Sequence, residues 1–141
     1  RRLRLPLLPV LDALAPGILL GLTILSLADF LAGDAYGAPS TLPWAVDLWG
    51  ARRHPVQLYQ LGAEVLALLA VLRRPATWPG QRAWLALFLY ALSRLLCDAF
   101  RGDSLLLAGG FRAEQLIALA VALAALPRVL TAPSRAEISA A

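Results

Sequence analysis

Three charged residues stand at helical spacing near the end of an apolar stretch: Arg94, Asp98 and Arg101. Residues three or four positions apart are neighbours on a helix surface, so these three share one face. A charge within or near a bilayer costs several kcal/mol unless it is paired or hydrated, which makes it a functional candidate by default. One interpretation is a structural ion pair that reaches the membrane interface. The other is an anion clamp, in which Asp98 orients Arg94 toward a phospholipid phosphate.

A second group of polar residues opens the apolar stretch that starts near residue 56. The segment 53–60 contains a cation, an imidazole, two amides and a phenol, and it includes His54, Gln57, Tyr59 and Gln60. In a membrane bundle these side chains must find hydrogen-bond partners inside the protein. His54 is the only histidine of the chain. A hydrogen-bonding or capping role at the helix start is favoured for it over a role as catalytic base.

Two further residues within the apolar stretches are expected to be buried. Glu64 stands one helical turn beyond Gln60 and is expected to face the bundle interior, where Arg94 or a segment outside this chain could pair with it. Cys97 is expected to be a small buried apolar residue. Because it is the only cysteine, an internal disulfide and a multi-cysteine metal site are excluded.

A loop with two carboxylates follows the first apolar stretch. Asp29 and Asp34 accompany glycines at 33 and 37, which permit left-handed turns of the backbone. No histidine or cysteine stands nearby in the sequence, so no metal site is expected here. On its own the segment predicts an ordered loop at the membrane interface.

The elements that must position these residues are four apolar segments. Apolar residues make up 60% of the chain and the mean hydropathy is +0.69, well above the average for soluble domains. A helix that crosses a membrane needs about 20 residues. The segments therefore predict an all-α, polytopic transmembrane bundle of about four spans, with a soluble or peripheral helical bundle as the alternative. They are Leu7–Leu27, Val56–Leu72, Ala83–Cys97 and Leu116–Leu130.

The arginines are distributed unevenly between the connections. They gather before the first segment, in the second connection and after the fourth segment, and the positive-inside rule places these parts in the cytoplasm. The connections 33–54 and 101–110 then meet at the outer face, together with the polar motifs. We expect one transmembrane domain over residues 1–130 and a disordered cytoplasmic tail over residues 131–141. The net charge of +4 is modest and no nucleic-acid-binding motif is present, so no nucleic-acid partner is expected.

Several motifs follow one another along the chain. They are Asp12-Ala13-Leu14-Ala15-Pro16-Gly17, Tyr36-Gly37-Ala38-Pro39-Ser40-Thr41-Leu42-Pro43-Trp44, His54-Pro55-Val56-Gln57-Leu58-Tyr59, the run from Arg94 through Asp98 and Phe100 to Asp103, and Glu114-Gln115-Leu116. In order and spacing they resemble the prolipoprotein diacylglyceryl transferase family, and the first looks like a helix start of that family. Members of the family are longer, and this chain contains no methionine. We therefore expect an N-terminally truncated piece that corresponds to the C-terminal half of a larger bundle.

The family's signature Gly-Arg-x-Gly-Asn-Phe-x-Asn-x-Glu-x-x-Gly is altered in residues 25–37. Ser26 stands where the resemblance implies an arginine that holds the lipid phosphate. Asp29 and Ala32 replace two asparagines, and Asp34 replaces a glutamate. Losing one guanidinium of a two-arginine clamp removes a charge-assisted hydrogen bond of about 1.5–3 kcal/mol. Asp29 also adds negative charge where an anionic lipid would sit, so both changes work against ordinary catalysis.

The resemblance implies transfer of the diacylglyceryl group from phosphatidylglycerol to the lipobox cysteine of prolipoproteins, in the bacterial inner membrane with the active face outward. The alternative is a catalytically inactive, transferase-like membrane protein that binds phospholipid. The implied partners are phosphatidylglycerol, prolipoprotein signal peptides and membrane lipids, with no metal and no organic cofactor. Arg94 would contact the lipid phosphate and Asp98 would orient it. We expect catalytic roles for Arg94, Asp98, Asp29 and Asp34, and substrate-binding roles for Arg94, Gly37, His54, Gln57, Tyr59 and Arg101.

Overall fold

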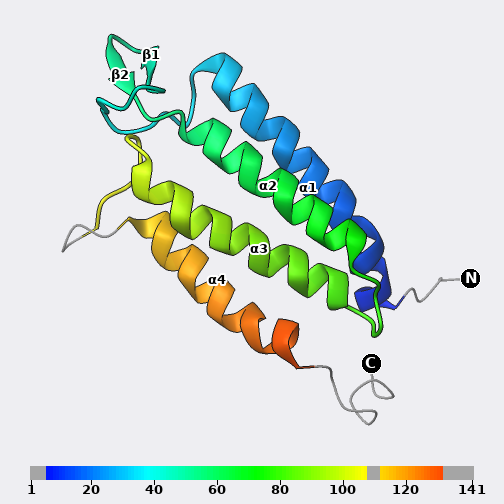
Figure 1. Ribbon diagram of the computed structural model, residues 1–141. Coiled ribbons are helices and arrows are strands. Elements are labelled where there is room, and N and C mark those ends of the chain that lie inside the picture. The colour runs from blue at the N-terminus through cyan, green and yellow to red at the C-terminus, as the bar shows by residue number, and fades with distance from the viewer. Residues whose placement is uncertain (1–5, 108–111, 132–141) are drawn as a thin grey trace, which may run out of the picture.

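The protein is a bundle of four long helices with a small hairpin at one end (Figure 1). The computed structural model describes residues 6–107 and 112–131. Its elements are the helices α1 (Leu7–Ala32), α2 (Val56–Arg73), α3 (Gln81–Cys97) and α4 (Ala113–Leu130), the strands β1 (Val46–Leu48) and β2 (Ala51–Arg53), and the short 3-10 helix η1 (Asp98–Phe100). The four expected apolar segments are therefore confirmed as helices. The antiparallel pair β1–β2 lies in the connection 33–54, where no strand is expected from the sequence.

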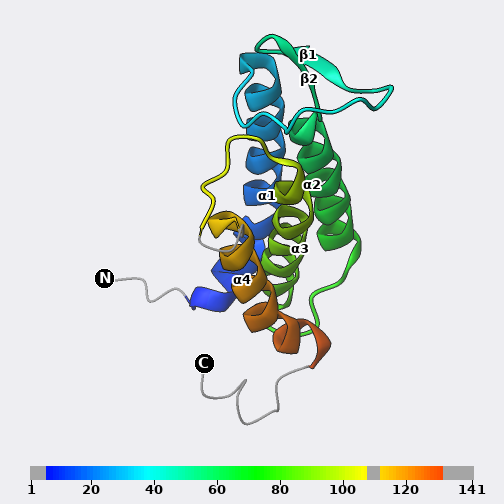
Figure 2. The ribbon, with the colours of Figure 1, turned by 90° about the vertical axis from the view of Figure 1, so that its left-hand side faces the viewer.

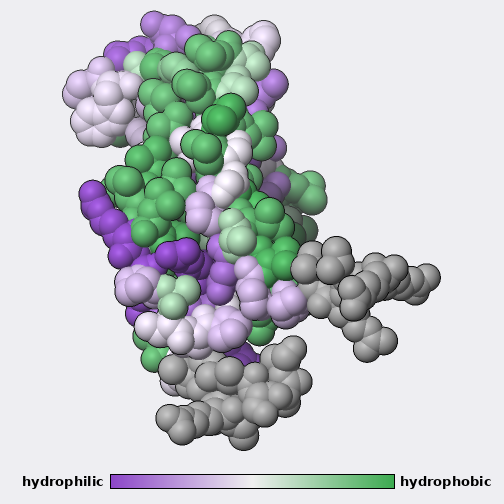
Figure 3. All heavy atoms as spheres, turned by 90° about the vertical axis from the view of Figure 1, so that its right-hand side faces the viewer, coloured by the Kyte–Doolittle hydropathy of each residue, from purple (hydrophilic) through white to green (hydrophobic). Residues whose placement is uncertain are grey.

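All four helices have the length and apolar character of membrane spans. Only 17–33% of each spanning window is buried within the described structure, so most of its apolar surface faces outward. Figure 3 shows one such face, which is mostly hydrophobic along the helices, with hydrophilic residues gathered toward its two ends. A continuous apolar surface of this size requires lipid or protein to cover it. The chain is thus a helical membrane bundle, and a soluble bundle does not fit it.

Small side chains allow the helices to pack closely. The buried core lies between α1, α2 and α3, while α4 packs against α3. Small residues at helix contacts are typical of membrane proteins, because van der Waals packing there replaces the hydrophobic effect as the driving force. The three buried residues of α4 are all alanines, spaced by four and three positions. The core consists of Ala15, Leu19, Ala67, Val71, Leu85 and Ala86.

A buried carboxylate ties the start of α3 to α1. The Asp12 carboxylate accepts hydrogen bonds from the backbone N–H of Gly80 at 2.6 Å and of Ala83 at 2.9 Å. Backbone N–H groups in the first turn of a helix have no partner within the helix, so an acceptor from another helix satisfies them. The expectation that the motif beginning at Asp12 starts a helix is wrong. The apolar residues before it extend α1 back to Leu7, and Pro16 lies inside the helix.

The connections 33–54 and 101–107 meet at the hairpin end of the bundle (Figure 2). The backbone N–H of Gly102 donates to the Tyr36 carbonyl at 2.9 Å, and the N–H of Ala38 donates to the Phe100 carbonyl at 2.8 Å. The start of α1, the connection between α2 and α3, and the end of α4 lie at the opposite end (Figure 1). The alternation predicted from the arginines is therefore present in the fold. Most of the expected tail over residues 131–141 lies outside the described residues.

Replacing Asp12 with alanine should destabilise the bundle. The substitution leaves two backbone N–H groups without an acceptor, and we expect it to lower the free energy of unfolding by about 1–3 kcal/mol. Equilibrium unfolding in detergent, followed by circular dichroism, measures the change. Asp47→Ala in the exposed part of β1 is the matched control, with an expected change within about 0.5 kcal/mol. Equal stability of Asp12→Ala and the unmodified protein would contradict the capping role.

Candidate functional site

A small polar cavity lies between α1, α2 and α3 near the hairpin end, with a volume of about 20 Å³. The helices α1 and α2 each contribute polar residues at helical spacing to its wall, α3 contributes Arg94, and Asp98 of η1 and Arg101 complete it. Polar groups of all three helices therefore converge here. The cavity is lined by Ser26, Asp29, Ala35, Val56, Gln57, Gln60, Arg94, Asp98 and Arg101.

An ion-paired group forms one wall of the cavity. The Asp98 carboxylate is 1% exposed and lies 3.1 Å from the Arg94 guanidinium and 3.8 Å from that of Arg101. The three charged groups therefore lie together as predicted, but only Arg94 belongs to α3, because Asp98 lies in η1 and Arg101 follows it. Arg94 retains 25% exposure of its side chain. It reaches from the buried carboxylate toward the surface, as a group that meets an incoming anion must.

Arg101 has a second acidic partner outside the helix. Its guanidinium donates two hydrogen bonds to the Asp103 carboxylate, at 2.9 and 2.8 Å. These hydrogen bonds raise the pKa of Arg101 above its ordinary value, so it stays charged at any physiological pH. Arg101 is thus more fully neutralised than Arg94, which has Asp98 as its only ion-pair partner among the described residues. Arg94 is the better candidate for an external anion.

A hydrogen-bond network connects the three helices beneath the cavity. The Ser26 hydroxyl donates to Glu64 at 2.8 Å, and the Gln60 amide donates to Glu64 at 3.0 Å and to the Ser93 hydroxyl at 2.9 Å. Glu64 is 2% exposed, which confirms that it faces the interior. Its partners are Ser26 and Gln60, and Arg94 is paired with a different carboxylate. No motif in the sequence assigns a role to Ser93; a hydroxyl within an apolar helix, next to Arg94, is the signal that could have revealed it.

The remaining loop carboxylates occupy different positions. Asp29 is half-buried and lines the cavity. Asp34 is exposed, and its backbone carbonyl accepts a 2.6 Å hydrogen bond from the Gln57 amide. Gln57 therefore joins the start of α2 to the loop that follows α1. The structure brings Asp29 and Gln57 to Arg94 at the cavity, whereas the side chain of Asp34 does not line it.

His54 and Tyr59 form an aromatic group beside the cavity. The Tyr59 hydroxyl accepts a hydrogen bond from the Trp44 indole at 2.8 Å and lies 3.4 Å from Nδ1 of His54. The ring of His54 packs against Phe100 with centroids 5.2 Å apart. His54 lies immediately before Pro55, the residue that precedes α2. Neither His54 nor Tyr59 lines the cavity, and the contacts of His54 suit the favoured hydrogen-bonding role.

Gly37 is enclosed between two other loop segments. A Cβ at this position would overlap the backbone carbonyl oxygen of His54, and the Gly37 carbonyl lies close to Gly102. The same carbonyl accepts a hydrogen bond from Arg53 at 3.3 Å. Glycine is therefore required at position 37 because no side chain fits in the space. A left-handed backbone is found instead at Gly33, which ends α1 with φ +79°.

The sequence profile of the prolipoprotein diacylglyceryl transferase family matches residues 1–131. The chain belongs to this family. It is similar to the phosphatidylglycerol–prolipoprotein diacylglyceryl transferase of Finegoldia magna, with 34% identity over 127 residues that cover 88% of this chain and 51% of that relative. The transferase of Gloeobacter violaceus is 35% identical over 134 residues, covering 85% of this chain and 49% of the relative.

A third relative, the transferase of Zymomonas mobilis, is 34% identical over 132 residues, which cover 85% of this chain and 46% of that protein. The chain spans about half the length of the curated relatives it matches. Within the described residues, no group of three or more histidine, cysteine or acidic side chains is arranged to hold a metal ion.

Substitution at Gly37 tests the packing of the site loops. Gly37→Ala should lower the free energy of unfolding by about 1–3 kcal/mol, because the added methyl group overlaps backbone that cannot move independently. Gly62→Ala within α2 is the matched control, since nothing lies within 4 Å of its added Cβ. The control should leave stability unchanged or raise it by up to about 1 kcal/mol. Chemical unfolding of both variants in detergent measures the difference, and equal effects of the two substitutions would contradict the enclosed position of Gly37.

Proposed function

We propose that this protein transfers the diacylglyceryl group of phosphatidylglycerol to the lipobox cysteine thiol of prolipoproteins. Family membership supports this reaction, as do the names of the relatives. The observation that carries the proposal is the ion pair of Arg94 and Asp98, which borders a polar cavity within membrane-spanning helices. A partly exposed guanidinium at that depth is suited to bind the phosphate of a lipid.

The reaction requires stabilisation of a leaving phosphate and removal of one proton. The thiolate sulfur of the precursor forms a bond to the glyceryl carbon, and the bond from that carbon to the phosphate oxygen breaks. The electron pair leaves on glycerol phosphate, and the thiol proton passes to a base. Arg94 is placed to stabilise the leaving phosphate, and the buried carboxylate of Asp98 fixes its orientation. Asp29, on the cavity wall, and Asp34, in the adjoining loop, are the candidate carboxylates for the proton.

The remaining polar residues have supporting roles in this proposal. Gln57 lines the cavity and fixes the loop that contains Asp34. Gly37 lets this loop approach its neighbours. Arg101 holds the buried side of Asp98, while His54 and Tyr59 shape the surface through which a precursor peptide would approach.

A phospholipid-binding protein without transfer activity is the second candidate. The hydroxyl of Ser26, which stands where the resemblance places a phosphate-binding arginine, donates to the buried Glu64. This position therefore offers no cation to a lipid. The cavity wall carries the carboxylates of Asp29 and Asp98 against the guanidinium groups of Arg94 and Arg101. Such a balanced wall favours binding over strong stabilisation of a leaving anion.

The proposal also includes the setting of the reaction. The protein would lie in the bacterial inner membrane as one transmembrane domain over residues 1–130, with the hairpin end facing outward and the tail over residues 131–141 in the cytoplasm. The distribution of arginines supports this orientation. Its partners would be phosphatidylglycerol, membrane lipids and the signal peptides of prolipoproteins.

Arg94 gives the decisive test of this function. The protein expressed from its complete gene and reconstituted with radiolabelled phosphatidylglycerol should attach label to a lipobox peptide. Arg94→Ala should reduce the rate by at least about 100-fold, because the leaving phosphate loses its charged donor. Arg128→Ala, in the exposed last turn of α4, is the matched control and should leave the rate unchanged.

Two outcomes separate the candidates. Lipid binding without any transfer by the correctly inserted, unmodified protein would favour the non-enzymatic candidate. Full transfer by Arg94→Ala would contradict the assigned role of the guanidinium.

A further inference from the structure

Two buried amide oxygens on the cavity wall have no hydrogen-bond donor among the described residues. They belong to Gln57 and Gln60, which are only 3% and 5% exposed. The Asp98 carboxylate oxygens also lack a hydrogen-bond donor among these residues, but Asp98 is ion-paired with Arg94 and Arg101. Both glutamines line the cavity. A buried polar group left without a partner costs about as much as a lost hydrogen bond, so nearly all such groups in folded proteins are paired. The two amide oxygens therefore point to a ligand that donates hydrogen bonds.

The hydrogen bonds of the two amides fix which atoms remain free. The Gln57 nitrogen donates to the backbone carbonyl of Asp34, which can only accept. The Gln60 nitrogen donates to Glu64 and to the Ser93 hydroxyl, which in turn donates to the Tyr90 carbonyl. Rotating either amide would place oxygen against oxygen. The hydrogen bonds therefore fix the orientation of both amides, and the free atom of each is its oxygen, which is an acceptor.

The size of the cavity restricts what can enter it. A volume of about 20 Å³ admits one group of the size of a water molecule or a hydroxyl. A phosphate is too large for it. Arg94, with 25% of its side chain exposed, stands on the same wall and can meet a phosphate outside the cavity. The cavity and the guanidinium together match a hydroxyl attached, through a short spacer, to a phosphodiester.

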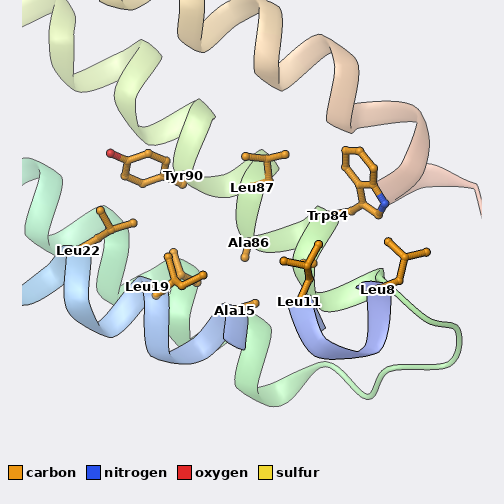
Figure 4. A pocket seen from close by; sticks show the side chains of 11 residues that line it. Leu8, Leu11, Ala15, Leu19, Leu22, Trp84, Ala86, Leu87 and Tyr90 are labelled. Atoms are coloured by element: carbon orange, nitrogen blue, oxygen red, sulfur yellow. The ribbon is translucent and has the colours of Figure 1, made fainter. Parts of the chain in front are cut away.

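An apolar groove of about 270 Å³ runs along α1 and α3, two of the three helices that border the cavity. Figure 4 shows Leu22 and Tyr90 at one end of the groove, and Leu8 and Trp84 at the other. Ser26 follows Leu22 by one helical turn, and Arg94 follows Tyr90 by one turn, so the groove leads toward the cavity. A ligand that reaches the cavity along this groove contacts apolar side chains before it reaches the polar groups of the cavity. This favours a lipid over a soluble phosphate ester.

We propose that Gln57 and Gln60 recognise the headgroup of the lipid: one headgroup hydroxyl enters the cavity and shares its single O–H between the two carboxamide oxygens in a bifurcated hydrogen bond, while the phosphate contacts Arg94. This inference rests on the proposed function and adds to it the residues that select a hydroxylated headgroup. An anionic lipid of equal charge without a hydroxyl leaves both oxygens unpaired and is discriminated against.

The test compares two lipids of equal charge. Phosphatidylglycerol and phosphatidylmethanol of the same acyl composition compete for the purified protein in zwitterionic micelles, against an acyl-labelled fluorescent phosphatidylglycerol. The unmodified protein should prefer phosphatidylglycerol by about tenfold, which is the contribution of roughly one hydrogen bond. Gln57→Met and Gln60→Met should each reduce this ratio toward one. Structural damage alone would weaken the binding of both lipids alike. The ratio of the two affinities therefore reports on the headgroup contact.

A matched variant and a soluble competitor complete the experiment. Gln115→Met removes an amide that donates to the Leu95 carbonyl at 3.1 Å, away from the cavity, and should retain the tenfold ratio. Glycerol phosphate should displace the labelled lipid only at concentrations at least about tenfold higher than phosphatidylglycerol. Displacement by glycerol phosphate at equal or lower concentration would overturn the lipid as the ligand.

The outcomes distinguish this inference from the function on which it rests. If the two anionic lipids bind with equal affinity, and both bind better than phosphatidylcholine, recognition of the headgroup hydroxyl is overturned. The anion-binding site of the proposed function then remains intact. Binding no better than that of phosphatidylcholine contradicts the proposed function itself. A tenfold preference that survives in Gln57→Met and Gln60→Met overturns the assignment to these residues.

Discussion

A buried carboxylate shared by two arginines determines the geometry of the site. Asp98 is almost inaccessible, and its charge in a membrane protein requires cationic partners. Arg94 and Arg101 supply them from positions that a helix and a following turn place on one face. Because Arg101 is also held by Asp103, Arg94 has the greater freedom to bind an external anion. The proposed binding of a lipid phosphate and the proposed reaction both depend on this unequal sharing.

Hydrogen bonds then fix the helices around the ion pair. Ser26 of α1 and Gln60 of α2 both donate to Glu64, and Gln60 also donates to Ser93 of α3. Within a membrane, such contacts and the close packing of small residues replace the hydrophobic effect as the force that aligns helices. At the opposite end, Asp12 fixes the start of α3 to α1. The two polar contacts, one at each end, define how α1 and α3 run past one another, and hence what faces the cavity.

Local patterns in the sequence predict much of this arrangement. The four helices follow from apolar length, and the face shared by Arg94 and Asp98 follows from their spacing, because both depend only on neighbours along the chain. Contacts between helices are different. The partners of Glu64, the bond from Gln57 to the Asp34 carbonyl and the role of Asp12 each join segments distant in sequence, and spacing along one helix says nothing of the facing one. The requirement at Gly37 likewise arises from two other segments that meet it.

The most direct measurement concerns the distance between one guanidinium and a lipid phosphorus. Solid-state NMR with ¹³C-labelled arginine in phosphatidylglycerol bilayers detects dephasing of guanidinium carbons by ³¹P, and Arg94→Lys identifies the share of that signal due to position 94. The account predicts a strongly dephased component, characteristic of direct guanidinium–phosphate contact, that disappears in Arg94→Lys. An identical dephasing curve for the two proteins would show that Arg94 pairs only with Asp98 and does not contact a lipid phosphate, and the account would be wrong.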